Sequence, residues 1–140
     1  MPFQPMAAPT LSGNVDPLVV TSTGPDPTMI LSVNTTWYIR VNWYITGYIA
    51  AALGGDWRVQ AFLESMGPGF EGPVAGPVNL SLAVAAPATT RNYVLTLTVP
   101  ANPLIVAGAY KLVLTILHVN GGVSTQMAAF VEGPILQFIP

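Results

Sequence analysis

Apolar and polar residues alternate along most of this chain with a period of two, not the 3.6 of an amphipathic helix. The clearest run covers 36–46, where every second residue is large and apolar: Trp37, Ile39, Val41, Trp43 and Ile45. The residues between them are mostly polar, which is the pattern of a strand with one face in a core and one face in water. The chain is therefore expected to be all-β.

The same alternation predicts seven strands, because each run is rich in Val, Ile, Leu, Thr and aromatic residues. Their expected positions are 29–33, 36–46, 57–63, 78–84, 93–99, 110–116 and 125–131. Turn signals separate them, and Asn120-Gly121-Gly122 indicates a tight hairpin between the last two strands. A long Gly/Pro connection is expected over 66–77, and one helical turn is possible over 48–53.

Seven such strands indicate a two-sheet antiparallel β-sandwich. Tyr110 begins the sixth strand just after a Pro-containing loop, 100–108. This placement resembles the tyrosine corner of immunoglobulin-like and fibronectin-III-like sandwiches, in which the hydroxyl binds upstream backbone; the other interpretation is an ordinary core tyrosine. The immunoglobulin plan implies that strands three, six and seven share one sheet, and that strands one, two, four and five share the other.

The two ends of the chain differ from the middle. Six prolines fall within 1–28, a density that a central strand does not tolerate. We therefore expect an extended N-terminal arm over 1–28, with one short strand at 18–21, ahead of a sandwich domain over 29–140. Gly133-Pro134 interrupts the seventh strand, and the apolar tail 135–139 is expected to fold on its own sheet or to pair with a neighbouring molecule.

Composition narrows the function. Only 7% of the residues are charged, against about 25% in a typical soluble domain. Arg40, Arg58, Arg91 and Lys111 are scattered, so nucleic-acid binding is not expected. Neither a signal peptide nor an apolar run fit to span a membrane as a helix is present, which favours a cytoplasmic or particle-associated protein. There is no cysteine and hence no disulfide.

Candidate catalytic groups are few. His118 is the sole histidine and lies at the end of a strand, which favours a structural role in anchoring a loop over a metal site. Glu64 and Glu71 flank a loop and could form a carboxylate pair, but two solvated acids are the simpler interpretation. The GxGxxG spelling at 67–72 contains Pro68 and Glu71 and precedes no helix, so it is not a nucleotide loop. We expect no enzyme, no cofactor and no metal.

Aromatic residues suggest one small-ligand candidate. Trp37, Trp43 and Trp57 have inward parity and are expected in the core. Tyr38 and Tyr44 share the outward face of one strand. Together with Phe70 at a loop tip, they form the possible ligand face of a carbohydrate-binding or small-ligand-binding module.

The favoured function follows from the other outward face. In the expected sheet of strands three, six and seven, the outward side chains are largely apolar. A large apolar patch on a soluble protein marks an interaction site. We therefore expect a non-enzymatic structural or interaction subunit that self-associates into a homo-oligomer or larger assembly. The expected contact residues are Phe62, Val113, Leu117, Ala128 and Phe130 on the sheet, with Ile135 and Phe138 from the tail.

Overall fold

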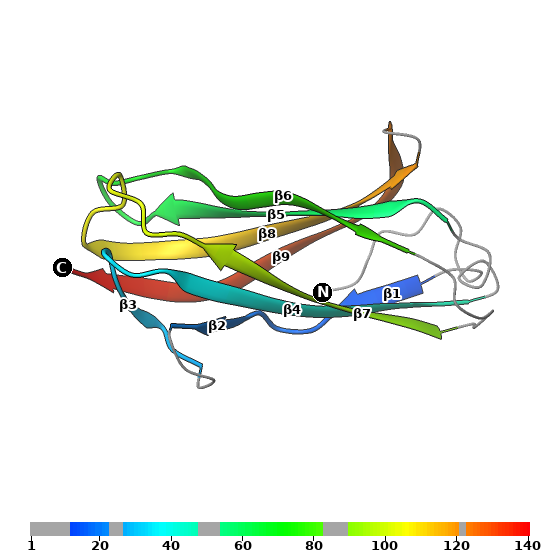
Figure 1. Cartoon of the computed structure of the whole chain (residues 1–140), viewed down its shortest axis with the longest axis horizontal. Helices are drawn as coiled ribbons and strands as arrows, with labels where there is room; N and C mark the ends of the chain where they lie inside the picture. Colours follow the sequence, from blue (N-terminus) through cyan, green and yellow to red (C-terminus); the bar gives the residue numbers. More distant parts are fainter. Residues whose placement is uncertain (1–11, 23–26, 48–53, 83–89, 121–122) are drawn as a thin grey trace.

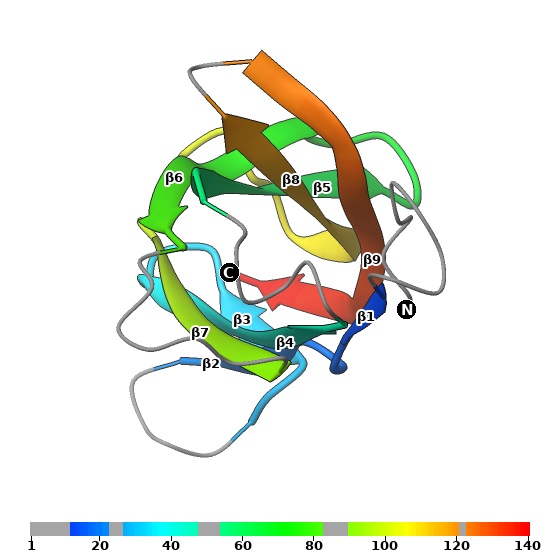
Figure 2. The same cartoon turned by 90° about the vertical axis from the view of Figure 1, so that its right-hand side faces the viewer.

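The computed structural model describes residues 12–22, 27–47, 54–82, 90–120 and 123–140. Within these residues the chain is all-β, with two sheets stacked face to face (Figures 1 and 2). One sheet contains β1 (Ser12–Val15), β2 (Val19–Thr21), β4 (Trp37–Thr46) and β7 (Thr90–Val99). The other has the order β3 (Ile30–Ser32), β9 (Val123–Ile139), β8 (Gly108–Asn120), β5 (Asp56–Ser65) and β6 (Gly72–Ser81). The helical turn expected over 48–53 lies outside the described residues.

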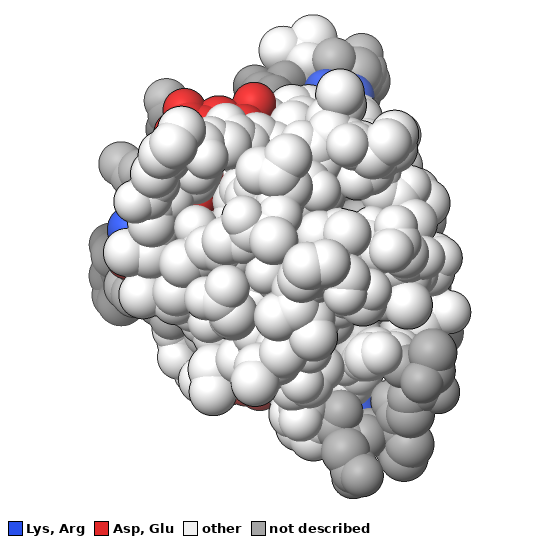
Figure 3. Space-filling model, turned by 90° about the vertical axis from the view of Figure 1, so that its left-hand side faces the viewer, with Lys and Arg blue, Asp and Glu red and all other residues white. Residues whose placement is uncertain are grey.

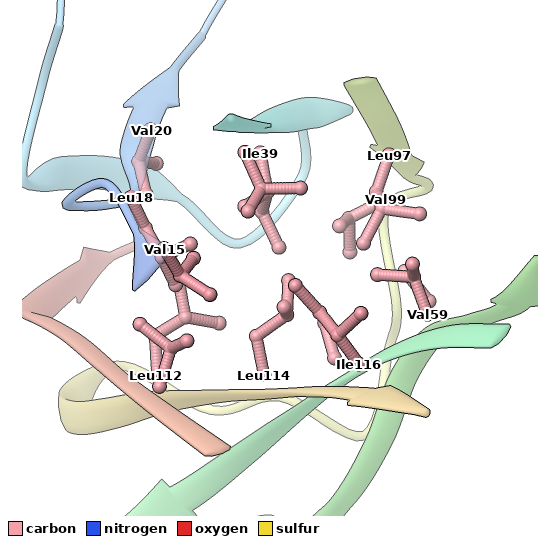
Figure 4. Packing of buried hydrophobic residues seen from close by; sticks show 14 of the residues in the cluster. Val15, Leu18, Val20, Ile39, Val59, Leu97, Val99, Leu112, Leu114 and Ile116 are labelled. Carbon is pink, nitrogen blue, oxygen red and sulfur yellow. The ribbon is translucent and has the colours of Figure 1, made fainter. Parts of the chain in front are cut away.

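The core lies between the two sheets and follows the predicted parity. In β4 the even-numbered side chains face out, and the odd-numbered ones are buried throughout. Figure 4 shows Ile39, Leu97 and Val99 from the four-stranded sheet pointing toward Val59, Leu114 and Ile116 from the five-stranded sheet. The inward tryptophans expected from the sequence are confirmed, since Trp37, Trp43 and Trp57 are all buried.

Sheet membership departs from the immunoglobulin plan in two strands. β5, β8 and β9 share a sheet as expected, but β6 joins them by pairing with β5, and β3 joins them by pairing with β9. The β5–β6 connection spans only 66–71, and such short connections favour pairing of consecutive strands. The β3–β9 pair is parallel, so the five-stranded sheet is mixed rather than wholly antiparallel.

The loop expected over 66–77 covers only 66–71 in the structure, half the expected length. β6 already begins at Gly72 and includes Pro73 and Pro77. The strand tolerates these prolines because β6 is at the edge of its sheet, where a missing N–H breaks no ladder. The same edge position leaves Val78 exposed, although its parity indicated the core.

The N-terminal segment is part of the sandwich where the structure describes it. β1 pairs with the second half of β4 and β2 with the first half, while β7 pairs with β4 along its whole length. The strand expected at 18–21 is present as β2. Val15, Leu18 and Val20 are buried in the same core cluster as the central strands.

The C-terminal tail folds on its own sheet, one of the two alternatives expected. β9 runs through Gly133-Pro134, where the register with β8 shifts by one residue. A β-carbon at Gly133 would lie only 3.0 Å from Leu18 Cδ1 and 3.1 Å from Leu112 Cδ2, so the strand packs closely at this point. Beyond it, the Phe138 ring lies edge-on to Trp37 and Tyr110 with centroids 5.8 and 5.3 Å apart.

Two local features agree with the sequence. β8 ends at Asn120 and β9 begins at Val123, its register partner, as expected of a tight hairpin. The Tyr110 hydroxyl donates a hydrogen bond of 2.8 Å to the carbonyl oxygen of Val106, while the ring is buried. This is the contact to upstream backbone that a tyrosine corner makes.

Candidate interaction surface

The outer face of the five-stranded sheet is less apolar than its sequence suggested. Strand register places Phe62, Val113 and Glu132 in one row across β5, β8 and β9. The next rows are Gln60–Thr115–Phe130 and Arg58–Leu117–Ala128. Each apolar side chain thus has a polar or charged residue in its row, which limits the size of any continuous apolar patch.

Burial divides the seven expected contact residues. Phe138 lies in the core and Val113 is buried on the outer face, so neither is available to a partner. Phe62, Leu117 and Ala128 are half-buried. Only two of the seven are more than half exposed: Phe130 at 51% and Ile135 at 54%. Val113 is buried because β8 is central in the sheet and a side chain there is flanked on both sides, whereas Phe138 is buried because its side of β9 faces the core.

A salt bridge lies on this face next to Ile135, which pairs with Lys111. Lys111 Nζ lies 2.7 Å from a carboxylate oxygen of Glu132. The hydrogen bond to Glu132 raises the pKa of Lys111, and the charges of Glu132 and Glu64 act in the same direction. Charged groups held together on the sheet surface oppose burial of this region against an apolar partner, because both would have to lose water.

Exposed apolar side chains gather at one end of the sandwich. Seven residues there are between 44% and 67% exposed, and we call them the apolar end: Met29, Ile30, Met66, Leu104, Val106, Ile135 and Ile139. They come from β3 and the residue before it, the β5–β6 and β7–β8 connections and the last residues of β9, all of which lie toward the left of Figure 1. Figure 3 views this end directly, and it is almost free of charged side chains except toward its margin.

Register explains why three isoleucines meet there. Ile30 pairs with Gln137 and Ser32 with Ile139, while Leu31 and Phe138 form the buried pair between them. Ile135 and Ile139 therefore flank Gln137 on the same outer face as Ile30. Diagonal neighbours of this kind lie about 7–8 Å apart, within reach of long side chains.

Sequence reasoning named only Ile135 among these residues. Met66, Leu104 and Val106 lie in connections, where strand parity assigns no face. Ile30 and Ile139 were missed because the parallel β3–β9 pair was not expected. Large apolar residues inside Pro/Gly-rich connections were the available signal, since such residues normally stay out of exposed loops.

The edge beside the apolar end is closed to strand addition by local hydrogen bonds. Thr28 Oγ1 donates to the carbonyl oxygen of Ile30 at 3.1 Å and accepts from its N–H at 3.2 Å. The carbonyl oxygen of Ser32 accepts from both the N–H and the Oγ1 of Thr35. A short, capped edge strand is a device that prevents edge-to-edge pairing. Contact at this end is thus left to side chains.

The three residues of the possible ligand face do not come together. Tyr38 and Tyr44 do face out from β4, but they are six residues apart, which is about 20 Å along a strand. Phe70 belongs to the connection before β6 and packs against the core cluster. No single small ligand could contact all three side chains.

His118 has the structural role expected of it. The side chain is buried, and its Nε2 lies 2.7 Å from the carbonyl oxygen of Gly54. A carbonyl oxygen only accepts, so Nε2 carries the proton. The imidazole thereby holds the residues just before β5, and its ring lies edge-on to Trp57 at 5.6 Å.

The acidic pair lies on open surface. Leu63 pairs with Gly72, so Glu64 and Glu71 stand just beyond the last β5–β6 partners, and both are exposed. Among the described residues, no three His, Asp or Glu side chains gather as a metal site would require. Nor do those residues include a helix long and apolar enough to cross a membrane.

Comparison with known proteins finds a similar fold but no matching family. No protein-family model and no curated protein matches the chain. Among solved structures, it is similar to the crystal structure of the C-terminal domain of wzt, with a TM-score of 0.60 over 91% of this chain and 74% of that one. The two are 13% identical, so the likeness supports the β-sandwich architecture alone, and fold by itself does not carry function.

Proposed function

We propose that this chain is a non-enzymatic structural or interaction subunit that self-associates into a homo-oligomer or a larger assembly. One observation carries the proposal: among the described residues, twelve large hydrophobic side chains are exposed, and seven of them form the apolar end. Exposed hydrophobic residues that are scattered singly need no explanation, but a gathered set marks a contact surface.

The energetics favour covering this surface. Seven half-exposed aliphatic side chains offer on the order of 500 Å² of apolar area, and burial contributes about 25 cal/mol per Å². That corresponds to on the order of 10 kcal/mol before the costs of association, which are of similar size. Because only 7% of the chain is charged, few side chains are available to keep such a surface solvated.

The outer face of the five-stranded sheet is a weaker contact than the apolar end. Phe130 is its only freely exposed aromatic residue, and the Lys111–Glu132 pair lies in the adjacent rows. Ile135 borders both regions, since it lies opposite Lys111 on the same outer face. We therefore place the principal contact at the apolar end, with this face at its margin.

The alternative function, a carbohydrate-binding or small-ligand-binding module, has less support. Its three candidate residues, Tyr38, Tyr44 and Phe70, lie too far apart to share a ligand. The similarity to the C-terminal domain of wzt bears on architecture and not on a ligand.

The particle mass in solution tests the proposal. Size-exclusion chromatography with light scattering should give a multiple of the 14.7 kDa chain mass across a wide range of protein concentration. A particle mass equal to that of one chain at every concentration would contradict the proposal.

A further inference from the structure

We infer that the apolar end is an isologous contact, in which two copies of this chain meet end to end about a two-fold axis. This inference rests on the proposed self-association and specifies its geometry. The occupant of the surface is the same surface of a second copy, and the unit formed is a closed dimer.

The charge distribution at the apolar end indicates what kind of partner surface can bind there. The centre of the apolar end lacks charged side chains, so a charged partner surface would lose its hydration there without gaining an ion pair (Figure 3). The partner surface must itself be uncharged and apolar. The apolar end holds seven of the twelve exposed large hydrophobic side chains of the described residues.

The distribution of the remaining exposed residues argues against a head-to-tail contact. The other five form no comparable group: Tyr44 and Val94 are diagonal neighbours on β4 and β7, and the rest are Val78 on β6 and Val123 and Phe130 on β9. A heterologous contact needs a second apolar surface elsewhere on the same molecule. Within the part of the chain that the structure describes, the surface that best matches the apolar end is therefore the same end of a second copy.

The available area suits a dimer. A stable interface buries about 800 Å² on each partner, of which roughly 60% is apolar. The seven side chains of the apolar end offer on the order of 500 Å², which is close to that apolar share. The charged residues toward the margin in Figure 3 are placed as an interface rim would be.

The capped edge of β3 decides how the copies touch. Thr28 occupies the outward N–H and carbonyl of Ile30, and Thr35 occupies the carbonyl of Ser32, so strand addition by a second copy is opposed there. Contact through side chains about a two-fold axis closes after two copies, because each copy then has its apolar end covered.

The first experiment compares two charged double variants by light scattering. Ile30→Glu with Leu104→Glu places charges in the apolar end, at positions 61% and 67% exposed. Val94→Glu with Phe130→Glu is the matched control, at positions 61% and 51% exposed on the two sheet faces. The wild type and the control should have twice the chain mass, and the first variant should have the mass of one chain. Circular dichroism and a cooperative thermal transition show that each variant is folded.

The second experiment leaves the surface charge unchanged and uses the lack of native cysteine. Single variants Ile30→Cys, Leu104→Cys and Ile139→Cys are oxidised mildly, with Val94→Cys as the control. A residue near a two-fold axis meets its own copy, so at least one of the three should form a disulfide-linked dimer rapidly, and Val94→Cys should not. Dimerisation should also persist at high salt, because the contact is apolar and the Lys111–Glu132 pair lies only at its border.

The outcomes separate the inference from the proposed function. A wild-type protein with the mass of one chain would overturn both. A dimer that survives the Ile30→Glu, Leu104→Glu change while the control dissociates would overturn only the end-to-end geometry. An open-ended polymer, or faster cross-linking at Val94→Cys than at the end, would likewise exclude the closed two-fold contact while self-association stands.

Discussion

At the residue scale, a cluster of aromatic side chains lies at the end of the core opposite the apolar end. Tyr93 stacks on Trp43 with centroids 5.6 Å apart and lies edge-on to Trp57 at 5.5 Å. The Arg91 guanidinium lies 5.7 Å from the Tyr93 ring centroid. Burial raises the pKa of the Tyr93 hydroxyl above 10.0, and Trp57 and Arg91 offset only part of that effect.

The raised pKa of Tyr93 predicts alkaline instability. The folded state holds this proton more tightly than the unfolded state does. The stabilisation from Tyr93 is therefore fully present below pH 10.0, the unfolded value, and is lost as pH rises through the folded pKa. Urea unfolding measured at successive pH values should show the free energy of unfolding falling above that pH.

The matched control for this effect is Tyr93→Phe, which keeps the ring and removes the titrating group. Its unfolding free energy should fall less steeply above pH 10.0 than that of the wild type. Equal slopes for the two proteins would show that other groups account for the alkaline loss.

The alternation of residues along a strand predicted the burial of some side chains correctly. The three tryptophans are expected in the core from their strand positions, and all three are buried. Parity did not predict that the outward Val113 is buried or that Val78 is exposed. Burial also depends on whether a strand is central, as β8 is, or at an edge, as β6 is. That information lies in the pairing of strands and not in the order of residues.

At the element scale, the two outer strands of the five-stranded sheet carry different protections against unwanted pairing. β6 has Pro73 and Pro77 and an irregular register with β5. β3 is three residues long and is capped through Thr28 and Thr35. Both are known means by which natural sheets avoid edge-to-edge aggregation.

Removal of the β3 cap should expose that edge. Thr28→Ala deletes the hydroxyl that occupies both the N–H and the carbonyl of Ile30. Because the site is exposed, stability should fall by no more than about 1 kcal/mol. Aggregation with thioflavin fluorescence should nevertheless become faster than in the wild type at equal concentration.

A suitable control is Thr98→Ala, which removes the same group from an exposed position on the outer face of β7. If the two variants aggregate at the same rate, the hydroxyl of Thr28 has no protective role.

At the scale of the whole molecule, the N-terminal segment links the two sheets. β1 and β2 complete the free edge of β4, and Leu18 between them reaches the close packing at Gly133 on β9. Figure 4 shows Leu18 and Val15 directed toward Leu112 on the opposite sheet. Residues that the proline content marked as an arm therefore contribute to the core.

Truncation of Leu18 should measure that contribution. Leu18→Ala removes a side chain that is 8% exposed, and buried Leu→Ala changes cost about 2–5 kcal/mol. We expect about 2 kcal/mol, the lower part of that range, because the site borders a surface pocket. Chemical unfolding gives the value directly.

Val19→Ala is the neighbouring control, since Val19 is only half-buried. It should lower the unfolding free energy by less than about 1 kcal/mol. A loss from Leu18→Ala no larger than this would mean that the segment is not part of the cooperative core.

The sequence by itself determined the class of structure, because a period-two pattern with β-branched and aromatic residues is stable only as strands that bury one face. It also determined which side of β4, β5 and β8 is inward, and the tight turn between β8 and β9. Tertiary structure alone decided which strands are neighbours, that β3 runs parallel to β9, and that loops distant in sequence form one apolar end. Alternation is a local property of a single strand, whereas neighbours, edges and ends depend on long-range pairing, which residue spacing does not encode.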